Sequence, residues 1–214
     1  MDIINAETDD KPNDLRESNK GGIVIIDYGA GNVRSVQFAL ERLGYSAICT
    51  NNSKLIQAAD KVIFPGVGEA NSAMVEIKKY GLEEVIPNLK QPVLGICLGM
   101  QLMCRFSKEN NTECLNIFPI DVMKFSNELK VPQISWNTLT NLKYALFKGV
   151  PENSFVYYVH SYYVPQNEYT IATTDYGLTY SGAIQRGNFY ACQFHPEKSS
   201  DIGEQILRNF IELN

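Results

Sequence analysis

The residues with the clearest potential for chemistry are Cys97 and, much later in the chain, His195 and Glu197. Cys97 stands in Gly95-Ile96-Cys97-Leu98-Gly99, directly after the apolar run Val93–Ile96. Glycines on both sides of a cysteine allow strained backbone angles and leave room for a substrate, as in the nucleophile elbow that joins a strand to a helix. The thiol would lie at the positive end of a helix beginning at Leu98, which favours the thiolate. We therefore predict that Cys97 is a nucleophile.

A nucleophilic cysteine needs a base and a further group that orients the base. The segment Gln193-Phe194-His195-Pro196-Glu197 supplies both. We expect 189–193 to be a strand that brings His195 to the edge of a sheet, and Pro196 to fix a turn from which Glu197 reaches the far ring nitrogen of His195. A His-Pro-Glu tripeptide alone is more typical of a surface turn. In combination with the Cys97 motif it favours a triad of Cys97, His195 and Glu197.

Attack on a carbonyl carbon creates an oxyanion, which preorganised backbone N–H groups stabilise. The amide of Leu98, directly after the nucleophile, is the expected first donor. Pro65-Gly66-Val67-Gly68 ends a neighbouring predicted strand and is the candidate for the second donor. The same four residues also fit an ordinary turn between a strand and a helix, and their local sequence leaves both interpretations open.

The elements that position these residues follow one pattern up to Cys97. Apolar, often β-branched runs alternate with stretches of helical spacing. The expected strands are 23–26, 47–49, 61–64 and 93–96, and the expected helices are 33–43, a short helix from 53, 69–79 and 82–89. Asn32 is placed to cap the first helix and Gly44 to end it. The alternation predicts an α/β fold with a mostly parallel central sheet and flanking helices.

The second half of the chain predicts antiparallel, β-rich structure. Strand-like stretches follow one another with few helices between them: 120–124, 155–164, 170–176, 178–185 and 189–193. Gly177 and Arg186-Gly187-Asn188 separate the last three as hairpins. A final amphipathic helix closes the chain, with one apolar face formed by Ile202, Ile206, Phe210 and Leu213.

Composition excludes several classes of function. The formal net charge of -5 gives no electrostatic footprint for nucleic acid or an anionic membrane, and the longest apolar runs are too short to cross a bilayer. Residues 1–21 are acidic and contain no aromatic side chain, so we expect a mobile N-terminal extension before a single folded domain, residues 22–214.

The cysteines and histidines point to a protein without metal. The five cysteines are scattered, without a CxxC pair or a disulfide spacing pattern, which favours a reducing cytoplasm. Four of them are expected to be buried and inert: Cys49, Cys104, Cys114 and Cys192. Cys104 is placed on roughly the same helix face as Cys97, in the core. Because there are only two histidines, we expect no metal site, and nothing in the sequence calls for a cofactor.

The motifs together resemble those of a known enzyme class. Gly95–Gln101 and His195-Pro196-Glu197 are similar to the class I, triad-type glutamine amidotransferases. The segments 27–32, 65–68, 158–163 and 192–199 further resemble the glutaminase subunits of imidazole glycerol phosphate synthase, over about residues 23–213. The resemblance implies a Cys-His-Glu triad, a γ-glutamyl thioester on Cys97, and ammonia passed to a (β/α)8-barrel cyclase partner in a heterodimer of histidine biosynthesis.

The resemblance also implies roles for residues outside the triad. It suggests Gln101 and the segment around His160, Ser161 and Tyr162 as glutamine contacts. Together with the candidate oxyanion donors Gly66, Val67, Gly68 and Leu98, they form the expected substrate site. From its surroundings alone, His160 is a packed or interface histidine rather than the base. Trp136, Asn137 and Lys198 are candidates for the partner interface, Trp136 by packing and Lys198 by pairing with a partner carboxylate. The alternative for Trp136 is ordinary core packing.

Two segments depart from the family's pattern and keep other functions open. Gln133-Ile134-Ser135-Trp136-Asn137 stands where the family often has His-Met-Gly-Trp-Asn, and Glu69-Ala70 replaces a small-aromatic pair. The first segment resembles the partner-facing surface, so a related glutaminase that feeds an enzyme amidating surface sugars is one alternative. A stand-alone cysteine hydrolase or peptidase is a second. A regulatory module with a relic site is a third, against which the intact triad residues argue.

Overall fold

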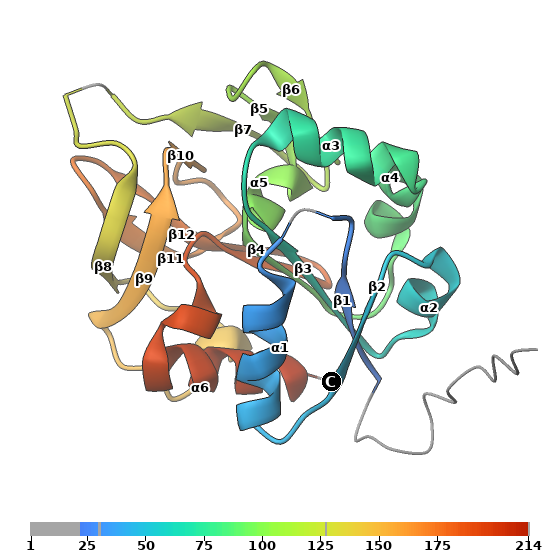
Figure 1. Cartoon of the computed structure of the whole chain (residues 1–214). Coiled ribbons are helices and arrows are strands. Elements are labelled where there is room, and N and C mark those ends of the chain that lie inside the picture. Colours follow the sequence, from blue (N-terminus) through green and yellow to red (C-terminus); the bar gives the residue numbers. More distant parts are fainter. Residues whose placement is uncertain (1–21, 30, 127, 214) are drawn as a thin grey trace, which may run out of the picture.

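A seven-stranded sheet with the order β11-β12-β13-β4-β3-β1-β2 forms the centre of the computed structural model, which describes residues 22–29, 31–126 and 128–213 (Figure 1). The pairs β1–β2, β1–β3, β3–β4 and β4–β13 are parallel, whereas β11–β12 and β12–β13 are antiparallel. The strands are β1 (Ile23–Ile26), β2 (Ala47–Thr50), β3 (Lys61–Gly66), β4 (Val93–Cys97), β11 (Thr170–Asp175), β12 (Thr179–Arg186) and β13 (Phe189–Cys192). The predicted mostly parallel α/β sheet is confirmed.

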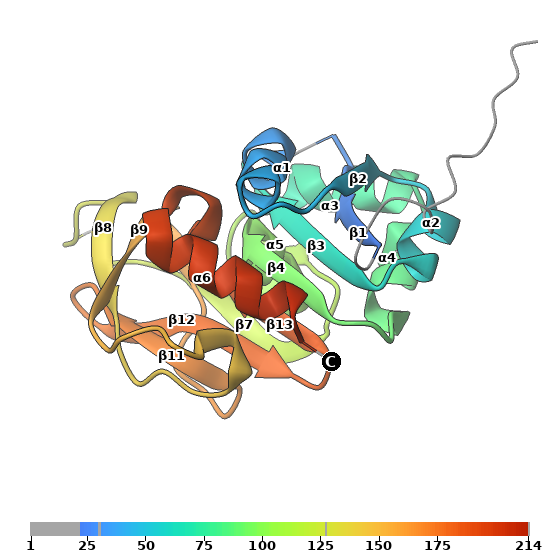
Figure 2. The same cartoon turned by 90° about the horizontal axis from the view of Figure 1, so that it is seen from below.

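Helices cover both faces of this sheet (Figure 2). Val24 and Ile26 pack towards the side of α2 (Ser53–Ala58), α3 (Ala70–Lys79), α4 (Leu82–Val85), η1 (Ile86–Asn88) and α5 (Leu98–Met103). Ile23 and Ile25 pack towards α1 (Val33–Arg42) and α6 (Ser200–Ile211). Successive side chains of a strand point to opposite faces, so a strand covered on both sides must be apolar throughout. This explains the uninterrupted apolar run of β1.

A smaller sheet with the order β10-β7-β5-β6 lies beside the central one. Its strands are β5 (Cys104–Ser107), β6 (Thr112–Glu113), β7 (Phe118–Lys124) and β10 (Tyr162–Tyr163). Two of them, β5 and β6, were not predicted. The expectation that Cys104 continues the helix after Cys97 is wrong, because α5 ends at Met103 and Cys104 begins β5. Cys104 is nevertheless fully buried, as expected.

A two-stranded antiparallel ribbon, β8 (Gln133–Leu139) and β9 (Ser154–His160), forms a separate pairing and adjoins β11 of the central sheet through a bridge between Thr140 and Thr173 (Figure 1). The strand predicted over 155–164 is divided into β9 and β10 at Ser161, and β8 was not predicted. Two short 3-10 helices complete this half: η2 (Ala145–Phe147) and η3 (Pro196–Lys198). The β-rich second half is confirmed, with more strands than the sequence indicated.

The predicted N-terminal extension, residues 1–21, lies outside the residues that the structure describes. In the described part of the chain, no helix is long and apolar enough to cross a membrane. Among the same residues, no three histidine, cysteine, aspartate or glutamate side chains gather as a metal ion would require.

Candidate active site

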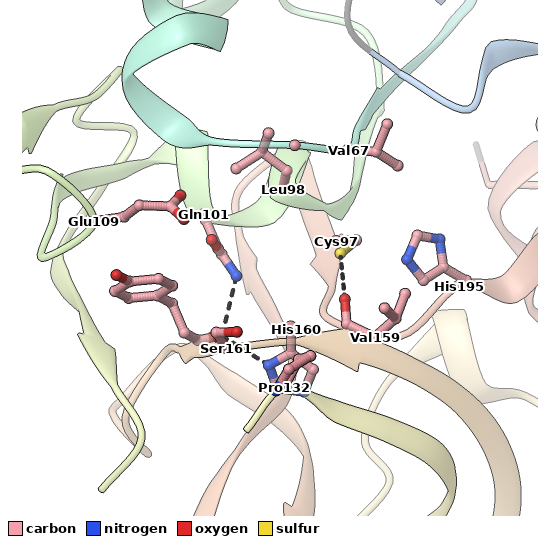
Figure 3. A pocket seen from close by; sticks show the side chains of 12 residues that line it. Val67, Cys97, Leu98, Gln101, Glu109, Pro132, Val159, His160, Ser161 and His195 are labelled. Atoms are coloured by element: carbon pink, nitrogen blue, oxygen red, sulfur yellow. Dashed lines mark hydrogen bonds between the residues drawn. The ribbon is translucent and has the colours of Figure 1, made fainter. Parts of the chain in front are cut away.

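The site lies where the parallel strands β3, β4 and β13 end at the same edge of the sheet. Gly66 at the end of β3 pairs with Cys97 at the end of β4, and Cys192 of β13 pairs with Ile96. Ligands of open α/β sheets bind outside the carboxyl ends of the strands. A pocket of about 320 Å³ opens there, lined by Val67, Gly68, Cys97, Leu98, Gln101, Glu109, Pro132, Val159, His160, Ser161, Tyr162 and His195 (Figure 3). The structure thus brings nearly all the predicted site residues together, with Gly66 and Glu197 directly behind the lining.

Cys97 has the strained backbone of a nucleophile elbow. Its φ of 54° and ψ of -108° lie in a region that residues with side chains rarely adopt, at a cost of roughly 1–3 kcal/mol. The strain falls on the cysteine itself, and neither Gly95 nor Gly99 has a positive φ. The expectation that these glycines themselves carry the strained backbone angles is therefore wrong. Their actual role is close packing, because a Cβ on Gly99 would collide with the Phe64 carbonyl oxygen.

His195 and Glu197 form a buried ion pair beside the nucleophile. His195 Nδ1 lies 2.8 Å from Glu197 Oε1, and both side chains are almost wholly enclosed. Since a carboxylate only accepts, Nδ1 carries a proton and Nε2 is the ring nitrogen left for the reaction. Nε2 is buried and has no hydrogen-bond partner among the described residues. Burial lowers the pKa of His195, but Cys97 and Glu197 outweigh it and raise the pKa to about 10.

The backbone of β9 holds both reacting residues. The His195 amide donates to the Tyr157 carbonyl at 2.9 Å, and the Cys97 thiol points to the Val159 carbonyl at 3.7 Å (Figure 3). Ser199 Oγ donates to the His195 carbonyl at 2.6 Å, and η3 begins at Pro196, so the turn predicted at Pro196 is present. Val159 was not predicted to lie in the site.

Asn32 contacts the triad instead of capping its helix. Its side chain makes no capping bond to α1, so that expectation is wrong. Asn32 Oδ1 accepts from Ser35 Oγ at 2.6 Å, and Nδ2 donates to Glu197 Oε1 at 3.5 Å. The bond from Ser35 fixes the amide orientation that presents Nδ2 to Glu197.

Gln101 lies in the pocket with its amide nitrogen already engaged. Nε2 donates to the Tyr162 carbonyl and to Gln193 Oε1, at 3.1 Å each. Both hydrogens of Nε2 are therefore used within the chain, and only Oε1 remains to accept from a bound molecule.

His160 is a structural histidine at the floor of the pocket. Its Nδ1 lies 2.7 Å from the Tyr162 carbonyl, and its Nε2 lies 3.2 Å from Tyr180 Oη. Burial lowers its pKa to about 4, which keeps the ring neutral near pH 7. Because a carbonyl accepts only, Nδ1 donates in the neutral ring and Nε2 is left as an acceptor, facing Tyr180 Oη, whose single hydroxyl proton is also within reach of Gln133 Oε1 at 3.0 Å. With both nitrogens occupied, His160 is not placed to act as the base, in agreement with its interpretation as a packed residue.

Glu109 is a pocket residue that the sequence did not indicate. It follows β5 in a turn rich in polar residues, which looks like an ordinary surface turn. Its Oε2 accepts from the Ala70 amide at 2.8 Å, and burial raises its pKa. The turn brings a carboxylate to the rim opposite the triad (Figure 3).

The three candidate interface residues lie outside the pocket. Trp136 is 49% exposed and stacks edge-on against Tyr157 at 5.9 Å, so it is not a core residue of this chain. Ile134 and Phe155 lie on the same face of the β8–β9 ribbon as Trp136, and they are 60% and 59% exposed. The Asn137 amide donates to the Asp175 carbonyl at 2.8 Å, and Lys198 is exposed next to the triad.

Comparison with known proteins agrees with this geometry. Residues 24–213 match the family model for Glutamine amidotransferase class-I, so the chain belongs to the class-I glutamine amidotransferases. It is 56% identical over 194 residues to the imidazole glycerol phosphate synthase subunit HisH of Bacteroides fragilis, covering 89% of this chain and 99% of that one. Its identity to HisH of Haemophilus influenzae is 47% over 192 residues, covering 89% and 96%. Within the class, the chain therefore belongs to the HisH family.

Solved structures of distant sequence share the fold. A crystal structure described as a glutamine amidotransferase aligns with a TM-score of 0.69 at 20% identity, covering 89% of this chain and 98% of that one. The structure of PurLQS from Thermotoga maritima aligns with a TM-score of 0.62 at 13% identity, covering 88% and 96%. At these identities the likeness concerns the fold alone.

Proposed function

We propose that this chain is the glutaminase subunit of an imidazole glycerol phosphate synthase, which hydrolyses glutamine to glutamate and ammonia. The observation that carries the proposal is the strained Cys97 beside the buried His195–Glu197 pair, at the mouth of one pocket. Identities of 46–56% to HisH subunits over most of the chain support the particular synthase.

The triad divides the hydrolysis into two steps. With the thiol proton held on His195 Nε2, Cys97 Sγ bonds to the side-chain carbonyl carbon of glutamine, and the C–N bond breaks as His195 gives that proton to the leaving ammonia. Water then attacks the γ-glutamyl thioester with His195 as base, which releases glutamate and restores the thiol. Glu197 holds the ring through Nδ1 and stabilises the imidazolium. No cofactor takes part in these steps.

The pocket supplies groups of the right chemistry for an amino-acid substrate. The Glu109 carboxylate is our candidate partner for the α-ammonium group of glutamine, since it lies across the pocket from Cys97. Gln101 Oε1 is a second acceptor, and Ser161 and Tyr162 line the same wall. The Leu98 amide is the proposed first donor to the oxyanion.

The second oxyanion donor comes from Pro65–Gly68, and this segment is the proposed gate. Gly66 is fixed in place, because an added Cβ would lie 2.8 Å from both Leu98 Cβ and Tyr28 Oη. Gly68 has a φ of 98° and open space around it. The peptide between Val67 and Gly68 is therefore the part that can rotate to turn an N–H towards the thioester oxygen.

The partner in this proposal is a (β/α)8-barrel cyclase that receives the ammonia in a cytoplasmic heterodimer. The outer face of the β8–β9 ribbon offers Trp136 for packing, and Lys198 is available for a partner carboxylate. Asn137 is held by the Asp175 carbonyl, so it acts in the interface by supporting the ribbon. Aromatic side chains dominate the binding energy of such interfaces.

The experiment measures glutamate and ammonia formation by the purified chain, alone and with the co-purified barrel chain. We expect poor turnover alone and an increase by orders of magnitude in the complex, because the oxyanion donors are complete only there. Cys97→Ala is the matched control and should abolish turnover while it preserves partner binding. Residual turnover in that variant would point to another nucleophile, and equal wild-type rates with and without the partner would refute the gate.

A further inference from the structure

Gln193 is a buried side chain next to the nucleophile to which the proposed mechanism gives no part. It directly follows β13, where Cys192 pairs with Ile96 of β4. Continuing this parallel register by one residue places Gln193 beside Cys97 at the carboxyl edge of the sheet. The side chain is wholly enclosed, and its backbone amide donates to the Gly182 carbonyl at 2.9 Å.

The orientation of the Gln193 amide is determined by its neighbours. Gln101 Nε2 donates to the Tyr162 carbonyl, which only accepts, so the nitrogen of Gln101 must be the atom on that side. The same nitrogen donates to Gln193 at 3.1 Å, which requires the oxygen of Gln193 to face it. Gln193 Nε2 is thereby turned to Cys97 Sγ, at 3.7 Å.

The sulfur therefore has two polar neighbours of opposite character. The Val159 carbonyl accepts only, so it bonds the protonated thiol and gives nothing to the thiolate. Gln193 Nε2 donates, so it bonds the thiolate. A hydrogen bond to a charged group is stronger than one to a neutral group, and the anion gains more from Gln193 than the thiol does.

We propose that Gln193 is a further catalytic residue, whose side-chain N–H stabilises the Cys97 thiolate, and that Gln101 positions it for this task. The proposal rests on the glutaminase function proposed above. Loss of the proton from Cys97 to His195 leaves a negative sulfur in a closed pocket, and Gln193 is the side-chain amide that meets it.

The test compares Gln193→Met with wild type in the full chain, free and with the barrel partner. Methionine keeps the length and removes the donor. We expect kcat to fall about 10- to 100-fold, with KM changed less than about threefold, because the lost bond is to a charged group that forms during the reaction. Iodoacetamide alkylation of Cys97 at pH 7, followed by peptide mass spectrometry, should slow by a similar factor and reach its half-maximal rate at higher pH. The ionisable groups that face Cys97, namely Tyr28, Tyr180, Cys192 and His195, are the same in both chains.

A second variant and a matched control separate this role from packing. Gln193→Glu keeps the acceptor for Gln101 but places a carboxylate oxygen at the sulfur, so alkylation should be slower still. Asn209→Leu removes a buried amide that donates to the Leu146 and Lys148 carbonyls, far along α6. It should lower stability without changing the alkylation rate of Cys97.

Unchanged alkylation and kcat in a folded Gln193→Met chain would overturn the proposal, as would an equal slowing of alkylation in Asn209→Leu. If the wild-type complex shows no glutamine turnover while alkylation still depends on Gln193, the donor is supported and only the glutaminase function fails.

Discussion

The two halves of the molecule fix their reacting groups by different means. In the parallel half, the elbow at Cys97 is set by backbone packing, since Gly66 and Gly99 leave no space between β3 and α5. In the β-rich half, His195 and His160 are set by side-chain and main-chain hydrogen bonds. Steric contact does not depend on pH or charge, whereas the hydrogen bonds do. Substitutions of the packed glycines in the first half should therefore lower stability, and those of the two histidines in the second half should lower activity or change the pH response.

The largest effect on chemistry is expected at the base. His195→Asn should lower kcat by at least about 10³-fold, because both the thiol proton and the proton for ammonia pass through the ring. Glu197→Gln should be milder, about 10- to 100-fold, since it keeps an acceptor for Nδ1 and removes the charge. Steady-state turnover of the partner complex measures both. A larger loss in Glu197→Gln than in His195→Asn would show that the roles within the triad are wrong.

The largest effect on stability is expected at Gly99. Gly99→Ala inserts a methyl group against the Phe64 carbonyl, and should lower the free energy of unfolding by about 3 kcal/mol or more. Gly187→Ala is the matched control, because it also adds one methyl group, to a position with a φ of 58° and open space. It should cost only about 1–2 kcal/mol from backbone strain. Urea unfolding curves measure both variants, and equal losses would contradict steric control of the elbow.

His160 should give the β-rich half its sensitivity to acid. Its pKa is lowered to about 4 in the folded chain, whereas an unfolded histidine titrates near about 6.5. Between these values the unfolded chain binds more protons, so the stability from neutral His160 is present above about pH 6.5 and is lost as the pH falls towards 4. From pH 7 to pH 5 the loss should be about 2 kcal/mol.

His160→Gln should remove that part of the pH dependence. Urea unfolding at pH 7 and pH 5 gives the difference for each chain, and the variant's difference should be smaller by about 2 kcal/mol. His195→Asn serves as a control of opposite sign and should increase the loss from pH 7 to pH 5 by about 1 kcal/mol, because the unfolded chain binds a proton at His195 over this range that the folded chain already holds. Its pKa is raised to about 10, so its contribution is present below about pH 6.5 and lost as the pH rises. An unchanged difference in His160→Gln would refute the neutral buried state.

The smallest effect on the isolated chain is expected at Trp136. Because the side chain is half exposed, Trp136→Ala should change the free energy of unfolding by less than about 1 kcal/mol. Affinity for the barrel partner should fall by about tenfold or more. Tyr144→Ala, at a 70% exposed aromatic beyond the end of β8, should leave the affinity unchanged. Thermal unfolding and a binding titration give the two values, and a misfolded Trp136→Ala chain would support the core interpretation instead.

The sequence predicted the parallel half better than the β-rich half, for physical reasons. Strands buried on both faces are apolar throughout and are easily found, as 23–26 shows. Strand β8 was missed because most of its inward residues are polar, including Gln133 and Ser135, while Trp136 points outwards. The pattern is the reverse of a normal surface strand, since the outer face is apolar.

The triad was predictable in position but its surroundings were not. Cys97, His195 and Glu197 stand in local motifs, whereas Glu109 comes from a turn that resembles any polar surface loop. The contact between Gln193 and Cys97 depends on the register of β13 against β4, which no local pattern encodes. Asn32 was misjudged because Ser35 and Glu197 compete for a side chain that would otherwise cap α1.

The edge of β9 that does not pair with β8 contacts both the base and the nucleophile. One edge of this strand pairs with β8, and an open second edge would present unpaired carbonyls to solvent or to another chain. Here the carbonyls of Tyr157 and Val159, two residues apart and about 7 Å along the strand, accept from the His195 amide and the Cys97 thiol. The spacing of these two carbonyls along β9 thus sets the distance between the base and the nucleophile. A tilt of the whole β8–β9 ribbon moves the two carbonyls together. The distance between the carbonyls is then preserved, while the distance from each carbonyl to the oxyanion donors changes.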